Sequence, residues 1–132
     1  MKIEHVGIAV KDLDTAVKTY GKLLNTPCYK REVVESEKVT TAFFRVGSTK
    51  VELLSAAGSG SAIEKFLEKR GEGIHHIAFE VDDIEKELTR LADDGFSLID
   101  EKPRKGADNK WIAFVHPKDN HGVLIELCQS TG

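Results

Sequence analysis

The amino-acid sequence contains one pattern twice, and this duplication constrains the fold more than any other feature. Residues 5–17 read HVGIAVKDLDTAV, and residues 76–88 read HIAFEVDDIEKEL. Two later pairs of segments also correspond: Ala42-Phe43 with Ala113-Phe114, and Val51-Glu52-Leu53 with Ile125-Glu126-Leu127. Each copy therefore carries a histidine at the start of the pattern and a glutamate near its end. A single duplication is not a solenoid, which needs at least three repeats.

Each copy predicts a strand, a helix and three further strands. The strands of the first copy are expected at Lys2–Val10, Val33–Val34, Val39–Arg45 and Lys50–Ser55, with a helix that begins after an Asp12 cap. The strands of the second copy are expected at His75–Val81, Ser97–Asp100, Trp111–His116 and Val123–Cys128, with a helix between Asp83 and Gly95. Between the copies, the capping box Ser61-x-x-Glu64 predicts a short helix that ends at Gly71.

This order of elements predicts an α+β fold made of two paired βαβββ modules that form a curled mixed sheet around a cleft. It alternates too irregularly for a doubly wound parallel sheet. We expect one domain over residues 1–132, made of a module at 1–58, a linker helix at 59–72 and a module at 73–132. A module of about 55–60 residues is marginal alone, so a shared core is expected.

The composition narrows the class of protein. The chain has 132 residues, of which 40% are hydrophobic, which is too many for a disordered chain. Its formal net charge of -3, with both signs interspersed, argues against a nucleic-acid partner. No apolar run approaches the about 20 residues that span a bilayer, so no membrane partner is expected. The N-terminus is unlike a signal peptide, and Cys28 and Cys128 have no zinc spacing, so we expect a cytoplasmic protein with reduced thiols.

Strand alternation places four side chains with metal-binding groups on one side of the sheet. His5 shares its face with Gly7 and Ala9, and His76 lies on the equivalent face of its own strand, opposite the bulky side chains that a helix would cover. Glu52 and Glu126 also point away from the helix-covered face. If the two copies pair about a pseudo-two-fold axis, all four side chains meet in the cleft.

Two histidines and two carboxylates suit a divalent transition metal better than calcium. The absence of thiolates argues against a closed structural zinc site. Taken singly, each histidine would more often be a satisfied core or surface residue, and each glutamate would simply face solvent. The recurrence of the same His–Glu pair at equivalent points of the duplication favours a metal cleft instead.

Other polar residues carry weaker signals. His75 has the opposite parity to His76, so this tandem supplies one ligand. His116 either contacts the substrate or supports one of the metal ligands, or it is an ordinary loop histidine. Four cations lie in a stretch that contains Pro and Gly: Lys102, Arg104, Lys105 and Lys110. They form either a solvated loop or an anchor for an anionic part of a substrate.

The chain resembles the vicinal oxygen chelate (glyoxalase/bleomycin resistance/dioxygenase) superfamily and, within it, the methylmalonyl-CoA epimerases. The resemblance covers nearly the whole chain, and its most specific segments are GEGIHHIAFEVDDI and HPKDNHGVLIEL. It implies a glyoxalase-like fold, an acyl-CoA substrate and a homodimer. It also implies that His5, Glu52, His76 and Glu126 hold a divalent cation, with Co²⁺ expected first and Mn²⁺, Ni²⁺, Zn²⁺ or Mg²⁺ as alternatives.

The implied reaction is epimerisation at carbon 2 of methylmalonyl-CoA through a metal-stabilised enolate, with Glu126 as the first acid/base group and Glu52 as the second. Some family members carry another Glu on the strand before VELL, where this chain reads Val39-Thr40-Thr41-Ala42, and the family often has Gly where Lys38 stands. Glu35 and Glu37 are nearby acids in the preceding loop. The basic residues at 102–110 would meet the CoA phosphates.

Two alternatives remain on the same fold. One is a glyoxalase I-like lactoylglutathione lyase, which uses the same ligand types and also proceeds through an enolate. The other is a binding protein without catalytic activity, which would have no need for the four ligands.

Overall fold

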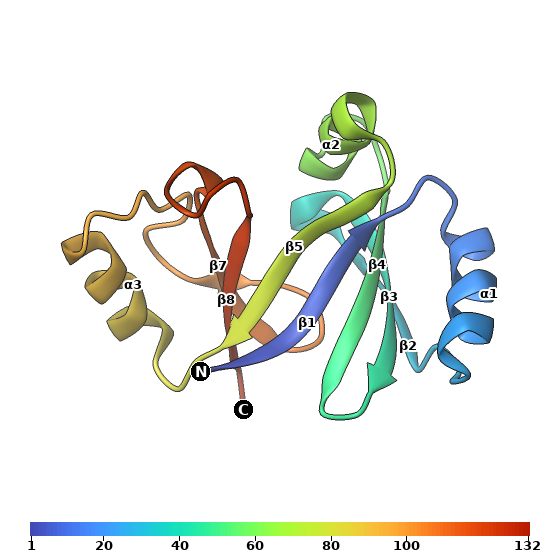
Figure 1. The fold of residues 1–132 in the computed structure, drawn as a ribbon, viewed down its shortest axis with the longest axis horizontal. Helices are drawn as coiled ribbons and strands as arrows, with labels where there is room; N and C mark the ends of the chain where they lie inside the picture. The colour runs from blue at the N-terminus through green and yellow to red at the C-terminus, as the bar shows by residue number, and fades with distance from the viewer. The chain divides into compact units, whose positions relative to one another are not determined.

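The computed structural model describes residues 1–132 and divides into two compact units (Figure 1). The first unit is His5–His75, and the second unit combines Met1–Glu4 with His76–Gly132. The unit boundaries fall inside two strands, β1 (Lys2–Ala9) and β5 (Gly73–Glu80). The first four residues of the chain therefore belong with the second copy of the repeat.

In the first unit, four strands follow the order β2-β3-β4-β1. β1 is parallel to β4, whereas β3 is antiparallel to both β2 and β4. The elements after β1 are α1 (Leu13–Leu24), β2 (Lys30–Val34), the 3₁₀ turn η1 (Glu35–Glu37), β3 (Val39–Val46), β4 (Thr49–Ala56) and α2 (Ala62–Arg70).

The second unit repeats this arrangement, with the order β5-β8-β7-β6. β5 is parallel to β8, and β7 is antiparallel to both β8 and β6. After β5 come α3 (Ile84–Asp93), β6 (Arg104–Lys105), β7 (Lys110–Val115), the 3₁₀ turn η2 (Pro117–Asp119) and β8 (Ile125–Ser130).

The helices begin where the sequence places capping side chains. The carboxylate of Asp12 accepts a hydrogen bond from Thr15 N at 3.1 Å, and Asp83 accepts one from Lys86 N at the same distance. Ser61 Oγ accepts from the backbone N–H of Glu64 at 3.0 Å, which confirms the predicted cap of the linker helix. Each cap satisfies a backbone donor that the first turn of a helix leaves unpaired.

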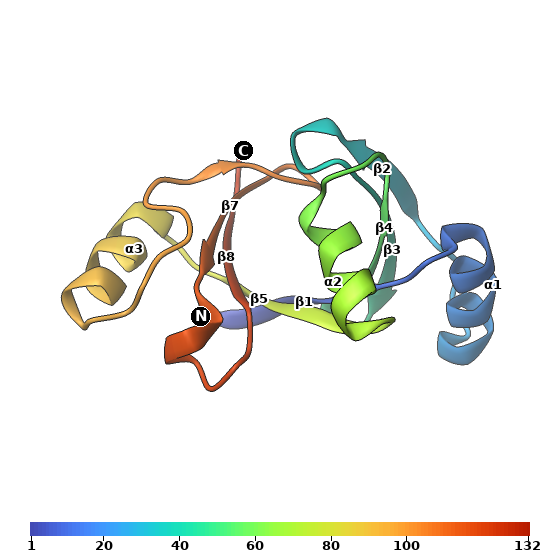
Figure 2. The same cartoon turned by 90° about the horizontal axis from the view of Figure 1, so that it is seen from above.

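The core of the first unit lies between α1 and one face of its strands. Its buried side chains are Val10, Leu13, Ala42, Phe44 and Leu53. Figure 2 shows α1 on one side of β3 and β4 and α2 on the other. The face that α1 leaves uncovered is the one on which sequence alternation places His5 and Glu52.

The core of the second unit lies in the same way between α3 and its strands. Its buried side chains are Val81, Ile84, Leu88, Ala113, Val115 and Leu127. A second, smaller cluster of Ala78, Ile112 and Cys128, with Phe114 packed against it, occupies the opposite face of the strands. That opposite face is the one that carries His76 and Glu126.

One predicted strand is wrong, and one strand was not predicted. Ser97–Asp100 contributes only an isolated bridge, from Leu98 to Val115. The strand next to β7 is instead the two-residue β6, which pairs Arg104 with Ile112. The polar, charged sequence of this stretch carries no alternation from which such a short edge strand could be recognised.

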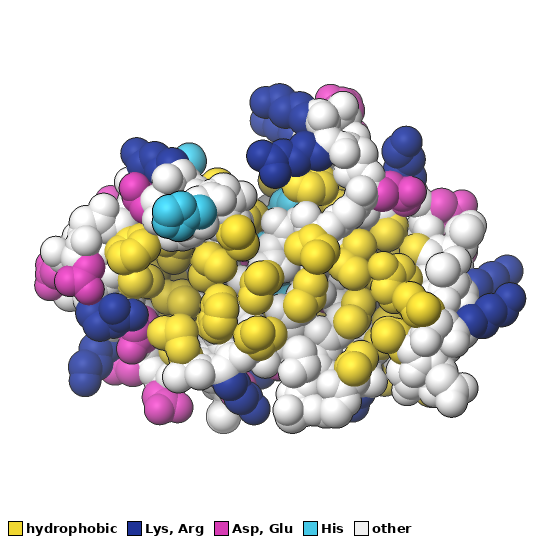
Figure 3. All heavy atoms as spheres, viewed as in Figure 1, with side chains coloured by type: hydrophobic (Ala, Val, Ile, Leu, Met, Phe, Trp, Pro, Cys, Tyr) yellow, Lys and Arg dark blue, Asp and Glu magenta, His cyan; other side chains and the backbone are white.

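A cavity of about 480 Å³ lies in the first unit between β1 and α1. Ile8, Val10, Ala16 and Tyr20 are among its lining residues, and Figure 3 shows hydrophobic side chains at the surface in this region. Because Ile8 and Val10 have the opposite parity to His5 on β1, the cavity lies on the helix side of the sheet. None of the helices is long and apolar enough to cross a membrane.

Candidate metal centre

In the first unit, two neighbouring parallel strands bring His5 and Glu52 together. The register pairs Gly7 with Glu52 and Ala9 with Leu54, so Glu52 points to the same face of the sheet as His5. His5 Nε2 lies 3.3 Å from Glu52 Oε1. The predicted pairing of a first-strand histidine with a last-strand glutamate is therefore present in this copy.

In the second unit, the equivalent strands form the equivalent pair. Ala78 on β5 lies opposite Glu126 on β8, which places Glu126 on the face of His76. His76 Nε2 lies 3.4 Å from Glu126 Oε1. The ring of Phe114, which is paired with Glu126 across β7 and β8, packs edge-on against the imidazole with 5.7 Å between centroids. This contact restricts the orientation of the His76 ring.

The four side chains are almost completely buried, with 5% exposure for His5, 4% for Glu52, 2% for His76 and 5% for Glu126. Buried carboxylates are rare unless they are paired or bind a metal. Ligand atoms about 2.1 Å from a common metal lie about 3.0–3.4 Å apart, for interligand angles between 90° and the tetrahedral value. The N–O distances in both pairs match this separation. His5, Glu52 and His76 are chemically suited to a divalent metal.

Small residues follow the two histidines on their faces of the strands. Gly7 and Ala9 follow His5 on its face of β1, and Ala78 follows His76 on β5. Ala9 and Ala78 are fully buried. Their side chains are short, whereas the opposite faces of the strands carry the bulky residues of the two cores.

Cys128 shares the face of Glu126 but is not a candidate ligand in its thiolate form. Its thiol is completely buried and lies 3.6 Å from Phe79 O, to which it donates. Burial, and next the nearby carboxylate of Glu126, raise the pKa of Cys128 well above its ordinary value. The neutral thiol acts here as a small apolar group in the cluster with Ala78 and Ile112.

The other two predicted histidines occupy different surroundings. His75 packs edge-on against Phe66 of α2, with ring centroids 4.9 Å apart, as its opposite parity to His76 predicts. His116 is exposed, and its Nδ1 accepts a hydrogen bond from Lys118 N at 3.0 Å. His116 therefore caps η2, a role for which its position before Pro117 was the sequence signal.

The four cations of the basic stretch do not form one surface. Lys102 is exposed, and the Lys105 ammonium lies 5.4 Å from the centroid of the Trp111 ring. Arg104 Nε donates to Asp100 Oδ1 at 3.0 Å, and its guanidinium lies over Phe114, 5.7 Å from the ring centroid. The side chain of Lys110 is only 11% exposed, because it packs among carboxylates.

Asp100 is a supporting residue that the sequence did not single out. Its carboxylate accepts from the backbone N–H of Phe114 at 2.9 Å as well as from Arg104. It therefore anchors both Phe114, which contacts His76, and the cation above that ring. Asp100 and Arg104 are four residues apart outside any helix, a spacing that alone gives no reason to expect a contact.

On β3, Thr41 occupies the face of Glu52. The β3–β4 register pairs Phe43 with Glu52 and Thr41 with Leu54, and Thr41 is 1% exposed. Its hydroxyl donates to Glu32 O at 3.3 Å. Of the loop acids considered from the sequence, Glu35 is exposed and Glu37 is half-buried, and both lie in η1.

Lys38 follows η1 in the left-handed backbone conformation, with φ of 53°. Glycine adopts this conformation without the steric cost that other residues pay. The lysine is held there by two contacts across the loop: Ala57 N donates to Lys38 O at 2.9 Å, and Lys38 Nζ donates to Ser59 O at 3.3 Å. The loop geometry that would suit glycine is therefore kept with a lysine.

The chain is similar to known proteins over most of its length. Residues 4–114 match the Glyoxalase/Bleomycin resistance protein/Dioxygenase superfamily. The chain is 42% identical to the uncharacterized protein YqjC of Bacillus subtilis, over 99% of this chain and 94% of that protein. It is 40% identical to the ethylmalonyl-CoA/methylmalonyl-CoA epimerase of Cereibacter sphaeroides, over 97% of each chain.

A solved structure of a related protein has the same fold. A variant of Streptomyces coelicolor methylmalonyl-CoA epimerase, in complex with 2-nitronate-propionyl-CoA, superposes with a TM-score of 0.96 and 36% identity over 100% of this chain and 96% of that one. This similarity confirms the predicted α+β, glyoxalase-like fold. The chain belongs to the Glyoxalase/Bleomycin resistance protein/Dioxygenase superfamily and is closely related to the methylmalonyl-CoA epimerases.

Proposed function

We propose that this protein is a methylmalonyl-CoA epimerase whose divalent metal is held by His5, Glu52, His76 and Glu126. The observation that carries the proposal is the buried His–Glu pair that recurs at the equivalent place in each copy of the repeat. The 40% identity to an ethylmalonyl-CoA/methylmalonyl-CoA epimerase supports the substrate class. Co²⁺ is the first metal to test, with Mn²⁺, Ni²⁺, Zn²⁺ and Mg²⁺ as alternatives.

The reaction needs the proton on carbon 2 to be removed from one face and returned to the other. When bound, a divalent metal supplies Lewis acidity that polarises the carboxylate and thioester oxygens of the substrate. The imidazoles of His5 and His76 contribute neutral nitrogen ligands, and their Nε2 atoms already face carboxylate oxygens. The packing of Phe114 against His76 helps to keep this ligand in place.

Carboxylates perform the proton transfers in this proposal. Glu126 takes the proton from carbon 2 on one face of the substrate, and Glu52 supplies a proton from the other face. The two residues are assigned opposite faces because they occupy equivalent positions in the two copies. Thr41, on the face of Glu52, offers only a hydroxyl that is already donated to Glu32 O.

The remaining predicted residues are assigned to the substrate's distant end. Lys102, Lys105, Arg104 and His116 are the residues proposed to bind the substrate there, with the cations meeting the CoA phosphates. The complex of 2-nitronate-propionyl-CoA with a structural relative supports an acyl-CoA ligand. We also propose that the protein is a homodimer.

The test is proton exchange at carbon 2 of methylmalonyl-CoA in D₂O, followed by ¹H NMR. The metal-loaded enzyme should incorporate deuterium at least 100-fold faster than the same solution without enzyme. Turnover of the methylglyoxal–glutathione adduct without exchange would instead identify a lactoylglutathione lyase. Acyl-CoA binding with neither reaction would identify a binding protein and refute the proposal.

A further inference from the structure

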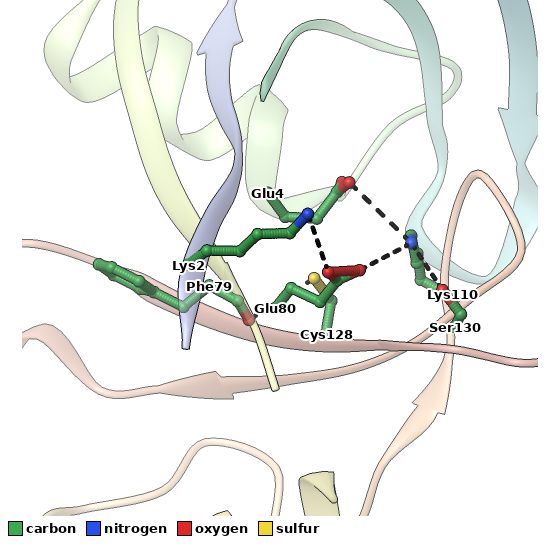
Figure 4. A network of polar contacts seen from close by, with 7 residues as sticks. All are labelled: Lys2, Glu4, Phe79, Glu80, Lys110, Cys128 and Ser130. Carbon is green, nitrogen blue, oxygen red and sulfur yellow. Dashed lines mark hydrogen bonds and ion pairs between the residues drawn. The ribbon is translucent and has the colours of Figure 1, made fainter. Parts of the chain in front are cut away.

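Lys110 differs from the other cations of the basic stretch because its side chain is only 11% exposed in the second unit. Figure 4 shows its ammonium directed between two carboxylates, with Ser130 beside it. Lys110 Nζ lies 3.5 Å from Glu80 Oε1, 3.9 Å from Glu4 Oε2 and 2.9 Å from Ser130 Oγ. The same carboxylate of Glu80 contacts Lys2 Nζ at 3.4 Å.

These contacts connect three strands of the second unit. Glu80 is at the end of β5, Lys110 at the start of β7, and Ser130 is paired with Lys110 at the end of β8. Lys2 and Glu4 come from the first four residues of the chain, which belong to this unit. The N-terminal segment is therefore held to the rest of the second unit by two ion pairs, Lys2 with Glu80 and Glu4 with Lys110.

The segment held in this way ends immediately before a proposed metal ligand. Glu4 is buried to 6% exposure and is followed by His5. A buried carboxylate whose cationic partner is fixed has few positions open to it, which restricts the backbone at Glu4. From His5 onward, β1 is also held by its register with β4, in which His5 lies opposite Lys50. The next residue begins the first unit, and its imidazole faces Glu52.

We propose that Lys110 is a positioning residue for metal binding, which acts by holding Glu4 and thereby the backbone that places His5. The inference rests on the proposed function only in taking His5 as a metal ligand. Buried ion pairs often contribute little net stability compared with apolar residues of the same volume. A need to fix the backbone before His5 explains the cluster of two lysines and two glutamates better than a gain in folding stability does.

A positioning role and a simple electrostatic effect of Lys110 predict opposite changes in metal affinity when its charge is removed. Glu126 lies on β8, the strand between β5, which carries Glu80, and β7, which carries Lys110. Removing the positive charge leaves this region more negative, which alone would strengthen the binding of a divalent cation. If Lys110 positions the ligand strand, its removal weakens binding instead.

The experiment compares Lys110→Met, Lys110→Arg and a matched control, Arg90→Met, in the full-length protein. Arg90 also bridges two carboxylates of the second unit, Glu87 at 2.8 Å and Asp94 at 3.6 Å, but on the surface of α3. Co²⁺ affinity is measured by titration calorimetry, and ligand geometry by the visible absorption spectrum of the bound Co²⁺. Thermal unfolding of the metal-free proteins gives stability separately.

Lys110→Met is expected to weaken Co²⁺ binding about tenfold or more and to alter the visible spectrum, as loss of an outer support for a ligand does. Lys110→Arg should retain most of the affinity, and Arg90→Met should bind Co²⁺ like the wild type. If Lys110→Met proves too unstable to titrate, the double variant Lys110→Met/Glu4→Gln also removes the buried charge of Glu4, and its affinity should still be low.

Unchanged or tighter Co²⁺ binding by a folded Lys110→Met or double variant, with an unaltered spectrum, would overturn the positioning role. Failure of the wild type to bind Co²⁺ would overturn it as well. Co²⁺ binding by the wild type without exchange at carbon 2 of methylmalonyl-CoA would refute the proposed activity alone. In that case the effect of Lys110 on affinity and spectrum would still decide the inference.

Discussion

His76 Nε2 lies 3.4 Å from Glu126 Oε1, on strands whose register places both side chains on the face that α3 does not cover. The equivalent pair in the other copy, His5 and Glu52, has a separation of 3.3 Å. A histidine and a carboxylate at this distance have the separation of two ligands of one metal ion. The duplication produces this pair in each copy from the same order of elements.

Glu126→Gln should slow deuterium exchange at carbon 2 by about 10²-fold or more, because it removes a proton-accepting group while keeping the side-chain shape. Glu52→Gln is the matched comparison, since an amide oxygen still ligates a metal but does not accept the proton. If Glu52 is the second acid/base group, epimerisation falls, while exchange through Glu126 continues and Co²⁺ stays bound. Exchange at the wild-type rate in Glu126→Gln would remove Glu126 from the proton transfer.

Metal removal should lower stability as well as abolish exchange. An ion that binds only the folded state stabilises it by about 2.7 kcal/mol when present at 100 times its Kd. Calorimetric scans of protein dialysed against EDTA, before and after addition of Co²⁺, measure the change in Tm. Glu52→Ala/Glu126→Ala serves as the control and should show no Co²⁺-dependent shift; a shift of wild-type size there would place the metal elsewhere.

The two thiols should react very differently with a thiol reagent such as Ellman's reagent. Burial raises the pKa of Cys128, so its reactive thiolate is suppressed in the folded protein, and the sulfur is also inaccessible. Cys28 is half-buried in the loop after α1. We expect one thiol per chain to react under native conditions and two in denaturant. Cys28→Ser should then show no native reaction, and rapid labelling of that variant would contradict the structure.

The Asp12 cap should give α1 a pH-dependent contribution to stability. The hydrogen bond from Thr15 N lowers the pKa of the Asp12 carboxyl in the folded protein. A lowered folded-state pKa means that the contribution is present above the ordinary carboxyl value of about 3.9 and is lost as the pH falls through the folded value. Asp12→Ala should therefore lower the Tm by roughly 2–5 °C at pH 7, and this difference should shrink in acid.

Asp12→Asn is the control for this cap, because asparagine caps helices without ionising. Its Tm at pH 7 should stay close to that of the wild type, and the difference between Asp12→Asn and Asp12→Ala should not depend on pH between 2 and 7. A pH-independent gap between wild type and Asp12→Ala would show that the carboxylate charge contributes nothing at this position.

The candidate ligands were predictable from the sequence because they depend on two simple regularities. Strand alternation fixes the face of His5 and of His76, and the internal repeat aligns Glu52 with Glu126. The caps at Asp12 and Ser61 were predictable for a similar reason, since capping depends on a few neighbouring residues.

The surroundings of Lys110 were not predictable from the sequence. In the sequence it is one of four cations in a loop-like stretch, but its surroundings come from Glu4 and Glu80, which are distant along the chain. The same limit applies to β6, whose two residues pair with β7 through tertiary contacts and carry no periodicity. Burial of a charged group depends on distant partners, and a local pattern contains no information about them.

The assignment of Met1–Glu4 to the second unit has a consequence for synthesis of the protein. The first unit, His5–His75, is a continuous segment that is complete once residue 75 has left the ribosome. The second unit joins segments from either side of the first, since Glu4 meets Lys110 and Lys110 meets Ser130. Met1–Glu4 must therefore wait until residues 76–130 have been synthesised, and the strand segment that precedes His5 reaches its final contacts only after the first unit has been made.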